Sequence, residues 1–200
     1  MQIQRIPILL LGLMILVLGT GCSDDSVAPP PSDTGQIFAS TAEKLMQNFS
    51  TSYTRLDDES YTALLDTRFK FYYNDGTDHD YATEVRITEN MFSGNPPTNP
   101  DPGSTNSGIR SVDVDKILPL ESWQPVSASH SDFGAIAGAK RGFYDVVFIF
   151  HHDAGTITVS CTQFFYAVPV TTMVGGEAKT EWKLLGQEDI GNKVIRISSN

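Results

Sequence analysis

An acidic residue within a predicted hairpin is the sharpest candidate for chemistry in this chain. Asp153-Ala154-Gly155 suits a three-residue turn with glycine in the left-handed position, so we predict a hairpin of two strands at about 142–152 and 156–168. This register places Asp145 opposite Gln163. The face that they share is predicted to hold Val147, Ile149, Val159, Cys161 and Phe165 as well.

A carboxylate among apolar neighbours has its charged form disfavoured, because burial removes it from water. Enzymes use this effect to hold an acid or a base near neutral pH. Asp145 is therefore a candidate acid–base residue in a pocket, with Gln163 beside it. Two alternatives remain open: this face is the outer, solvated one, or Asp145 lies near an open strand end and pairs with Arg110 or Arg141.

Two stretches, one rich in histidine and one acidic, contain residue types that bind metal ions, but the spacing of these residues does not suit a metal site. His151 and His152 are adjacent on a predicted strand and therefore point to opposite faces, so we expect a surface pair and no metal site. The stretch 74–80 crowds carboxylates around Gly76, but the glycine comes too early for a calcium loop and no Glu follows at the required distance. Turn and helix-capping roles explain its aspartates.

Several aromatic residues are candidates for lining an apolar ligand. Tyr72, Tyr81 and Trp182 combine a large apolar body with a polar tip that can orient a bound molecule. Packing in the core is the competing interpretation for most of the aromatic residues. We interpret Cys161, on a strand among apolar residues, as an inert buried thiol.

Composition and missing motifs narrow the function classes. The chain has 200 residues, 40% of them hydrophobic, which suits one packed domain with modest extras. Its net charge of −10 argues against nucleic acid as a partner. The sequence contains neither Gly-Xaa-Ser-Xaa-Gly nor a glycine-rich phosphate loop, and no cofactor is expected.

Helix signals concentrate in the first part of the predicted domain. Ser40 and Glu43 form a capping box ahead of an apolar stripe, which predicts a helix at about 41–55. Asp57 predicts the start of a second, short helix. Thr77 and Asp80 are start signals for a third helix at about 79–92.

Strands dominate the rest of the chain. Phe69, Phe71 and Tyr73 alternate with polar or charged residues, which predicts a half-buried strand before the third helix. A long loop is expected from Ser93 to Gly108. The remaining predicted strands are 109–118, 142–152, 156–168 and 180–187.

The N-terminus has the layout of an export signal. Arg5 precedes an apolar run from Ile6 to Leu18, which is too short to span a bilayer, and small residues lead into Cys22. The segment resembles a bacterial lipoprotein signal, which implies removal of residues 1–21 and lipidation of Cys22 with fatty acids such as palmitate. Ordinary signal cleavage is the alternative. The Pro-rich residues 22–36 then form a tether, and residues 37–200 form the domain.

The order of helices and strands resembles a known superfamily. The apolar and aromatic placement from Glu43 to Tyr72, and Glu181-Trp182-Lys183-Leu184-Leu185 near the end, are similar to nuclear transport factor 2-like proteins of the cystatin-like type. The resemblance implies an α+β fold in which three N-terminal helices pack on a curved, mainly antiparallel sheet. Such a sheet forms a cone that can hold a pocket. Members include isomerases, cyclases and dehydratases as well as binding domains, so fold alone does not assign an activity.

Three functional hypotheses follow. The first is a lipid-anchored domain of the cell envelope, outside the cytoplasm, that binds a small apolar ligand or a protein without catalysis. The second is an isomerase, cyclase or dehydratase that uses Asp145. The third is a homodimer formed through the open face of the sheet, for which the predicted outward residues are Tyr144, Val146, Phe148, Phe150 and Phe164.

Overall fold

The computed structural model describes residues 38–96, 108–174 and 176–198. The chain divides into two units, residues 1–34 and 35–200, and the predicted signal, Cys22 and most of the tether lie outside the described residues. None of the helices within the described ranges is long and apolar enough to cross a membrane.

Three helices form one layer, and side-chain caps start each of them. They are α1 (Ala42–Arg55), α2 (Asp58–Leu64) and α3 (Tyr81–Phe92). Asp57 and Asp80 cap α2 and α3 as predicted, accepting bonds from the backbone N–H groups of Ser60 and Thr83. The predicted cap of α1 was one residue too early, because Thr41 and not Ser40 accepts the bond, from the backbone N–H of Lys44.

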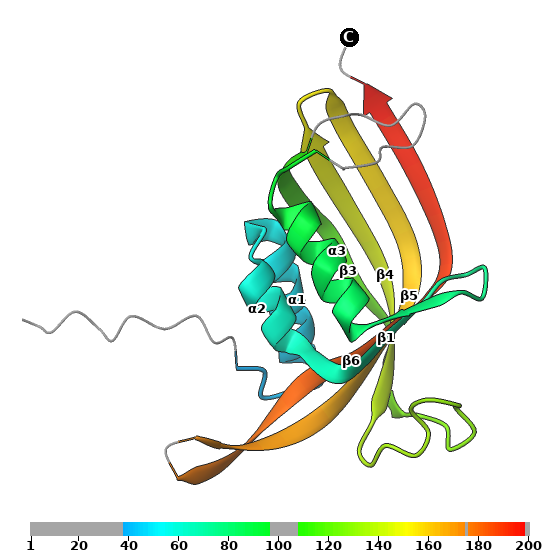
Figure 1. Cartoon of the computed structure of the whole chain (residues 1–200). Helices are drawn as coiled ribbons and strands as arrows, with labels where there is room; N and C mark the ends of the chain where they lie inside the picture. Colours follow the sequence, from blue (N-terminus) through cyan, green and yellow to red (C-terminus); the bar gives the residue numbers. More distant parts are fainter. Residues whose placement is uncertain (1–37, 97–107, 175, 199–200) are drawn as a thin grey trace, which may run out of the picture. The chain divides into compact units, whose positions relative to one another are not determined.

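Six strands form a single sheet against which the helices pack, so the predicted α+β arrangement is confirmed (Figure 1). The strand order is β2-β1-β6-β5-β4-β3, and every neighbouring pair is antiparallel except β1 and β6. The strands are β1 (Leu65–Tyr72), β2 (Asp78–Asp80), β3 (Ile109–Pro125), β4 (Lys140–His152), β5 (Gly155–Val174) and β6 (Glu177–Ser198).

The register of the β4–β5 hairpin differs from the prediction by one residue. His152 pairs with Gly155, so the loop holds only Asp153 and Ala154. Because side chains alternate between faces, this shift moves Gln163 to the face opposite Asp145. The helices also cover the face of β4 that was predicted to point outward: Tyr144, Val146, Phe148 and Phe150 pack in the main core, and only Phe164 of the predicted outward residues lies on the outer face.

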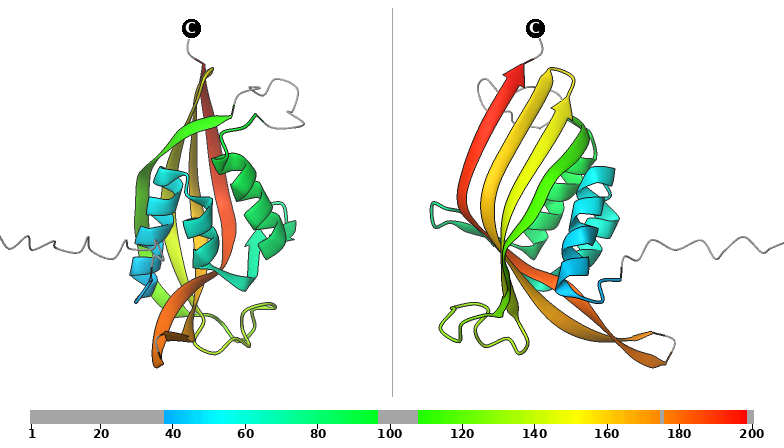
Figure 2. Two further views of the ribbon diagram at one scale, coloured as in Figure 1. Left: turned by 60° about the vertical axis from the view of Figure 1, so that its left-hand side comes forward. Right: turned by 180° about the vertical axis from the view of Figure 1, so that it is seen from behind.

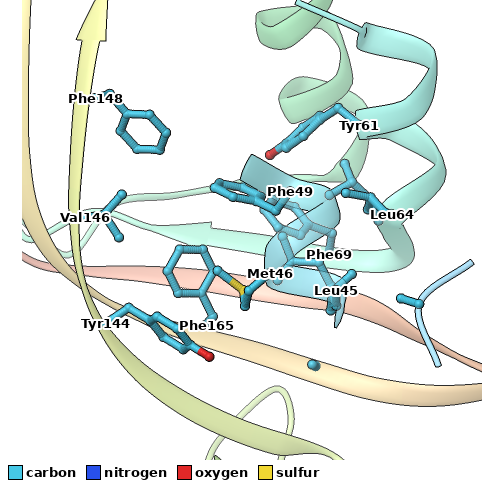
Figure 3. Close-up of a cluster of buried hydrophobic side chains, with 14 of the residues drawn as sticks. Leu45, Met46, Phe49, Tyr61, Leu64, Phe69, Tyr144, Val146, Phe148 and Phe165 are labelled. Atoms are coloured by element: carbon cyan, nitrogen blue, oxygen red, sulfur yellow. The ribbon is translucent and has the colours of Figure 1, made fainter. Parts of the chain in front are cut away.

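The core lies between the helices and the inner face of the sheet (Figure 3). Leu45, Met46 and Phe49 of α1 point toward Val146 and Phe165 of the sheet. Each side chain of this size contributes about 1.5–3 kcal/mol when it is fully buried.

A second, smaller cluster covers part of the outer face. The segment 126–139 places Phe133 against Tyr72 and Tyr166. Close approach at this point requires glycine at position 186, because an added Cβ would lie 2.7 Å from both the Phe133 ring and the backbone oxygen of Lys70. The segment is therefore packed onto the sheet.

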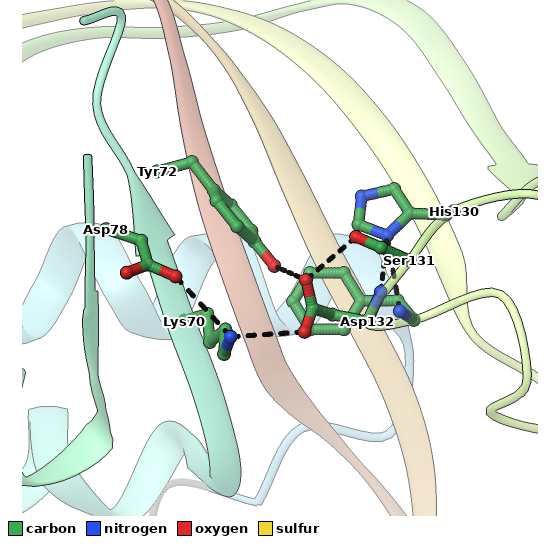
Figure 4. A network of polar contacts seen from close by, with 7 residues as sticks. Lys70, Tyr72, Asp78, His130, Ser131 and Asp132 are labelled. Carbon is green, nitrogen blue, oxygen red and sulfur yellow. Dashed lines mark hydrogen bonds and ion pairs between the residues drawn. The ribbon is translucent and has the colours of Figure 1, made fainter. Parts of the chain in front are cut away.

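Polar contacts fasten the same segment (Figure 4). Tyr72 donates a hydrogen bond of 2.6 Å to the Asp132 carboxylate, and the Lys70 ammonium lies 3.1 Å from it. Ser131 donates to it as well. The bond from Tyr72, with the contacts of Lys70 and Ser131, lowers the pKa of Asp132 to about 2, against the opposing effect of burial.

The strands β5 and β6 run on past the predicted ends at 168 and 180 and form a two-stranded arm (Figure 2). The arm pairs Pro169 with Trp182 at its base and Met173 with Ala178 near its tip. Met173 is 70% exposed. The arm is held mainly by the backbone hydrogen bonds between its two strands. Because neither face of the arm is packed in a core toward the tip, its sequence does not alternate there between apolar and polar residues, and that alternation is the signal from which strand ends are predicted.

Stability should depend on the Asp132 contacts in a defined pH range. The pKa of Asp132 is depressed from 3.8 to about 2, so its stabilisation is complete above pH 4 and is lost as the pH falls toward 2. We expect Asp132→Asn to lower the free energy of unfolding by about 1 kcal/mol at pH 6, a value discounted for partial exposure, and by nothing near pH 2. Urea unfolding across this range measures it. Asp115→Asn, at an exposed position of β3, should show no such convergence, and a constant difference for Asp132→Asn would contradict the assignment.

Candidate functional site

The space between α1 and the inner face of the sheet is filled by aromatic rings. The Phe49 ring lies 4.8 Å from Tyr53, 5.9 Å from Tyr61, 6.3 Å from Phe148 and 5.4 Å from Phe165, measured between centroids. The region where the family resemblance implies a pocket is therefore packed around Phe49, and a ligand site has to be sought at the borders of this core.

A buried carboxylate ties four elements together at one border. Glu84 of α3 accepts a hydrogen bond of 2.6 Å from the Tyr61 hydroxyl of α2 and lies 2.6 Å from Nε2 of His79 in β2. Gln187 of β6 donates to the same hydroxyl at 3.4 Å. Burial, with the charges of Tyr53 and Glu84, raises the pKa of Tyr61 well above its ordinary value, so its hydroxyl stays protonated as a donor.

This network is built to stabilise the fold. The side chains of Glu84 and His79 are only 7% and 10% exposed, and the His79 ring stacks on Phe71 with an interplanar angle of 3°. Water and a substrate therefore have little access to either group in this conformation. The carboxylate joins α3 to α2 and to the β2 edge of the sheet.

The cleft between α1 and β3 is the best candidate for a ligand site. It has a volume of about 430 Å³, and its lining includes Met46 of α1, Val114 and Ile117 of β3, and Tyr144 of β4. Met46 and Tyr144 belong to the buried core, so the cleft reaches down to the apolar interior. Its polar lining comes from one side of α1 and consists of Glu43, Gln47 and Ser50.

The local sequence explains this geometry. On α1, Glu43, Gln47 and Ser50 follow one another at helical spacing and line one side of the cleft. On β3, Val112, Val114 and Ile117 pair with inner-face residues of β4, and the register shift between Val114 and Lys116 restores Ile117 to that face. Apolar and polar groups therefore meet along the open edge of the sheet.

A second cleft, of about 550 Å³, lies at the border of α2, α3 and β6, and it is more polar. The exposed carboxylates of Asp58, Glu59 and Glu89 line it together with Tyr81. The one cation among its lining residues, Lys183, donates 2.6 Å to the backbone oxygen of Ala63 and lies 2.9 Å from Glu181. The lysine is thus committed to internal contacts.

Asp145 and Gln163, which were predicted to lie opposite each other on one face, are on different faces of the sheet. Asp145 lies on the outer face in an ion pair with Lys116 of β3, and Gln163 lies on the inner face opposite Tyr144. The prediction that they share a face was wrong, because the turn holds two residues and not three. On that face the Asp145 carboxylate is 26% exposed and has the Lys116 ammonium as its partner.

The other predicted ligand residues lie apart from one another. Tyr72 belongs to the outer network with Asp132, Tyr81 lines the polar cleft, and Trp182 stands at the base of the arm with the Lys140 ammonium 5.1 Å from its ring centroid. They therefore do not form one site.

The histidine and cysteine residues are occupied by local contacts. His151 pairs with Asp113 at 2.8 Å, and Nδ1 of His152 accepts from the backbone of Ala154. Within the described ranges, no group of three His, Cys, Asp or Glu residues has the arrangement of a metal site. Burial, with the charges of Asp189 and Asp145, raises the pKa of the Cys161 thiol to about 12, which keeps it protonated at neutral pH.

Sequence reasoning missed two features of this region. Glu84 and Thr88 fall at helical spacing with Phe92, so an acidic residue on the apolar stripe of α3 was the available signal for the buried network. For the α1–β3 cleft there was no local signal, because its residues come together only through the pairing of β3 with β4.

Comparisons with known proteins address the fold. No family model matches the chain, and no curated protein sequence matches it. Among solved structures, a hexachlorocyclohexane dehydrochlorinase is similar at 8% identity and TM-score 0.47, covering 76% of this chain and 84% of that one. A nuclear transport factor 2-like protein of Rhodospirillum rubrum is similar at 12% identity and TM-score 0.41, covering 74% and 96% respectively.

A further nuclear transport factor 2-like protein, from Prochlorococcus marinus, is similar at 12% identity and TM-score 0.43 and covers 76% of this chain and 90% of that one. At these identities the likeness concerns the fold alone, and the activity of the dehydrochlorinase is not transferred to this chain.

The buried network should matter for stability. Replacing Glu84 with Gln keeps the shape of the side chain but removes its charge. The amide N–H₂ donor of Gln then faces either Tyr61 or His79, in the place of a carboxylate oxygen. We expect a loss of about 2–3 kcal/mol in the free energy of unfolding, measured by urea denaturation. Glu89→Gln, at an exposed position of the same helix, should change it by less than about 0.5 kcal/mol. Equal effects of the two substitutions would show that the network is not stabilising.

Proposed function

We propose that this protein is a lipoprotein of the bacterial cell envelope whose domain binds a small amphipathic molecule, without catalysis, in the α1–β3 cleft. The observation that carries the ligand proposal is the apolar depth of that cleft, beside a domain interior that its own aromatic rings fill. The layout of the N-terminal sequence supports the anchor at Cys22.

The lining of the cleft favours the apolar end of an amphipathic ligand over a ligand that is wholly polar. Met46, Val114, Ile117 and Tyr144 offer apolar contacts, and a ligand that covers them removes apolar surface from water. A volume of about 430 Å³ is within the range of small-molecule sites.

The charge of the cleft lining determines which polar group the ligand can carry. Glu43 is the charged residue of the cleft lining, and the whole chain carries a net charge of −10. An anionic head group would be repelled, whereas an ammonium or hydroxyl group can approach the Glu43 carboxylate and the Gln47 amide. The ligand class is therefore a neutral or cationic amphiphile.

Binding of Nile red, an uncharged apolar dye, tests the site. We expect the mature chain with Cys22→Ser to bind the dye, and Ile117→Gln to weaken binding about tenfold, because it places an amide in the apolar lining. Leu118→Gln is the matched control, since Leu118 is the next residue of β3 and pairs with Asp145 on the other face. Absence of dye binding, or equal weakening by both substitutions, would refute the site.

Competition tests the head-group preference. Octylamine should displace the dye at about a tenfold lower concentration than octanoate, and Glu43→Gln should remove most of that difference. A preference for octanoate would contradict the assigned ligand class while leaving the site itself in place.

The anchor is tested independently. In bacteria that express the whole chain, a clickable palmitate analogue should label the wild-type protein and leave Cys22→Ser unlabelled, because acylation requires the thiol of Cys22. The labelled protein should sediment with membranes. Cys161→Ser is the control and should retain the label, since Cys161 is buried. Unlabelled wild-type protein would disprove the anchor.

A further inference from the structure

On one face of the β5–β6 arm, the two strands of the arm carry no charged side chains; Lys140 of β4 lies against Trp182 at its base. Opposite residues on paired strands share a face, so alternate pairs of the arm line up on the same side. The face in question is made by Pro169, Thr171, Met173, Ala178, Thr180 and Trp182.

This face continues the helix-covered side of the sheet beyond the helices. Ala167 and Leu184, two residues back along the arm, are packed in the main core. Farther out, Thr171, Met173, Ala178 and Thr180 are exposed, and the Thr171 and Thr180 hydroxyl groups lie 3.1 Å apart and satisfy each other. The arm thus presents a side of low polarity to its surroundings.

The opposite face of the arm has a different character. It carries the exposed Lys179 opposite Thr172, and Glu181 opposite Val170, where the Glu181 carboxylate lies 2.9 Å from the Lys183 ammonium. A charged side chain loses hydration when it enters the boundary of a bilayer, and this costs free energy. The uncharged face is therefore the side of the arm best able to approach a bilayer.

The chain enters the domain beside this arm. The backbone oxygen of Ala39 accepts a hydrogen bond of 2.7 Å from the backbone N–H of Trp182, and the neighbouring Phe38 is 42% exposed. The base of the arm and the point from which the chain leads back to Cys22 therefore lie together. Figure 1 shows the arm on the opposite end of β5 from the β4–β5 turn.

The distances allow contact with the membrane that holds the anchor. The chain from Cys22 to Ile37 can reach at most about 55 Å when fully extended, whereas the arm from Pro169 to Met173 projects only about 15 Å. The reach of the tether is therefore sufficient to let the arm touch the bilayer. An anchored domain also has a high effective concentration at the surface, so a weak contact is enough.

We propose that the uncharged face of the arm, with Met173 near its tip, rests on the surface of the lipid bilayer to which Cys22 is attached. This inference rests on the proposed anchor, and it adds an orientation: the arm faces the membrane and the β4–β5 turn faces away. The α1–β3 cleft is then held at a fixed side of the domain relative to the bilayer.

A fluorescent probe at Met173 tests the orientation. The mature chain carries Cys22→Ser, an N-terminal hexahistidine tag, and Met173→Cys labelled with an environment-sensitive dye; the buried Cys161 thiol leaves the introduced one as the reactive site. On neutral phosphatidylcholine vesicles with nickel-chelating lipid, we expect emission to rise at least about twofold and to be quenched by spin-labelled lipid. The same dye at Ala154→Cys, in the exposed β4–β5 turn, should not respond.

Introducing a negative charge on one face or the other distinguishes the two faces of the arm. Ala178→Glu, opposite the probe on the uncharged face, should abolish most of the vesicle response, and Thr172→Glu on the other face should preserve it. A probe at Met173 that stays in water, or equal responses at both probe positions, overturns the proposal and points to a protein partner for the arm.

The vesicle experiment supplies the tether chemically, so it is independent of acylation in the cell. If Cys22 is not labelled in bacteria, the proposed anchor is refuted, and a positive vesicle result is not affected. If Cys22 is labelled and the probe at Met173 does not respond to vesicles, only the proposed orientation of the arm is refuted.

Discussion

The structure depends on the burial of Phe49 between α1 and the sheet. Four aromatic rings surround it within 6.3 Å, and they come from α1, α2, β4 and β5. Because this packing excludes water, the neighbouring Glu84 carboxylate must be fully bonded, and Tyr61 and His79 supply those bonds. The same packing leaves the apolar cleft at the border of the core, where α1 meets the edge strand β3, as the best place for a ligand among the described residues.

Local signals predicted the helical layer well. Asp57 and Asp80 cap helices because a carboxylate can accept from the free backbone N–H groups of a first turn, a property of a few adjacent residues. The same logic placed the cap of α1 at Ser40, one residue too early, because the adjacent hydroxyl of Thr41 can accept the same kind of bond and is the one that does so. The α+β arrangement followed from the order of such elements.

The candidate site was harder to predict, because it depends on pairing at a distance. A single residue in the β4–β5 turn decides whether Asp145 shares its face with Gln163 or with Thr162, and the local sequence does not fix the length of that turn. The α1–β3 cleft depends in addition on a bulge between Val114 and Lys116. The ends of β5 and β6 were missed because exposed strands of an arm show no apolar alternation.

The parallel pairing of β1 with β6 has a consequence for how the chain folds. Leu65 finds its partner Leu184 across more than half of the chain, and the β1–β6 pairing to which this contact belongs is the only strand pairing between the β2-β1 edge and the rest of the described sheet. The helices and the first two strands therefore have no complete sheet to pack on until the last strand has been synthesised. Folding of such a topology is late and slow, since long loops must close first. The apolar faces of the helices and of β1 therefore stay without their partner strand until β6 has paired with both β1 and β5.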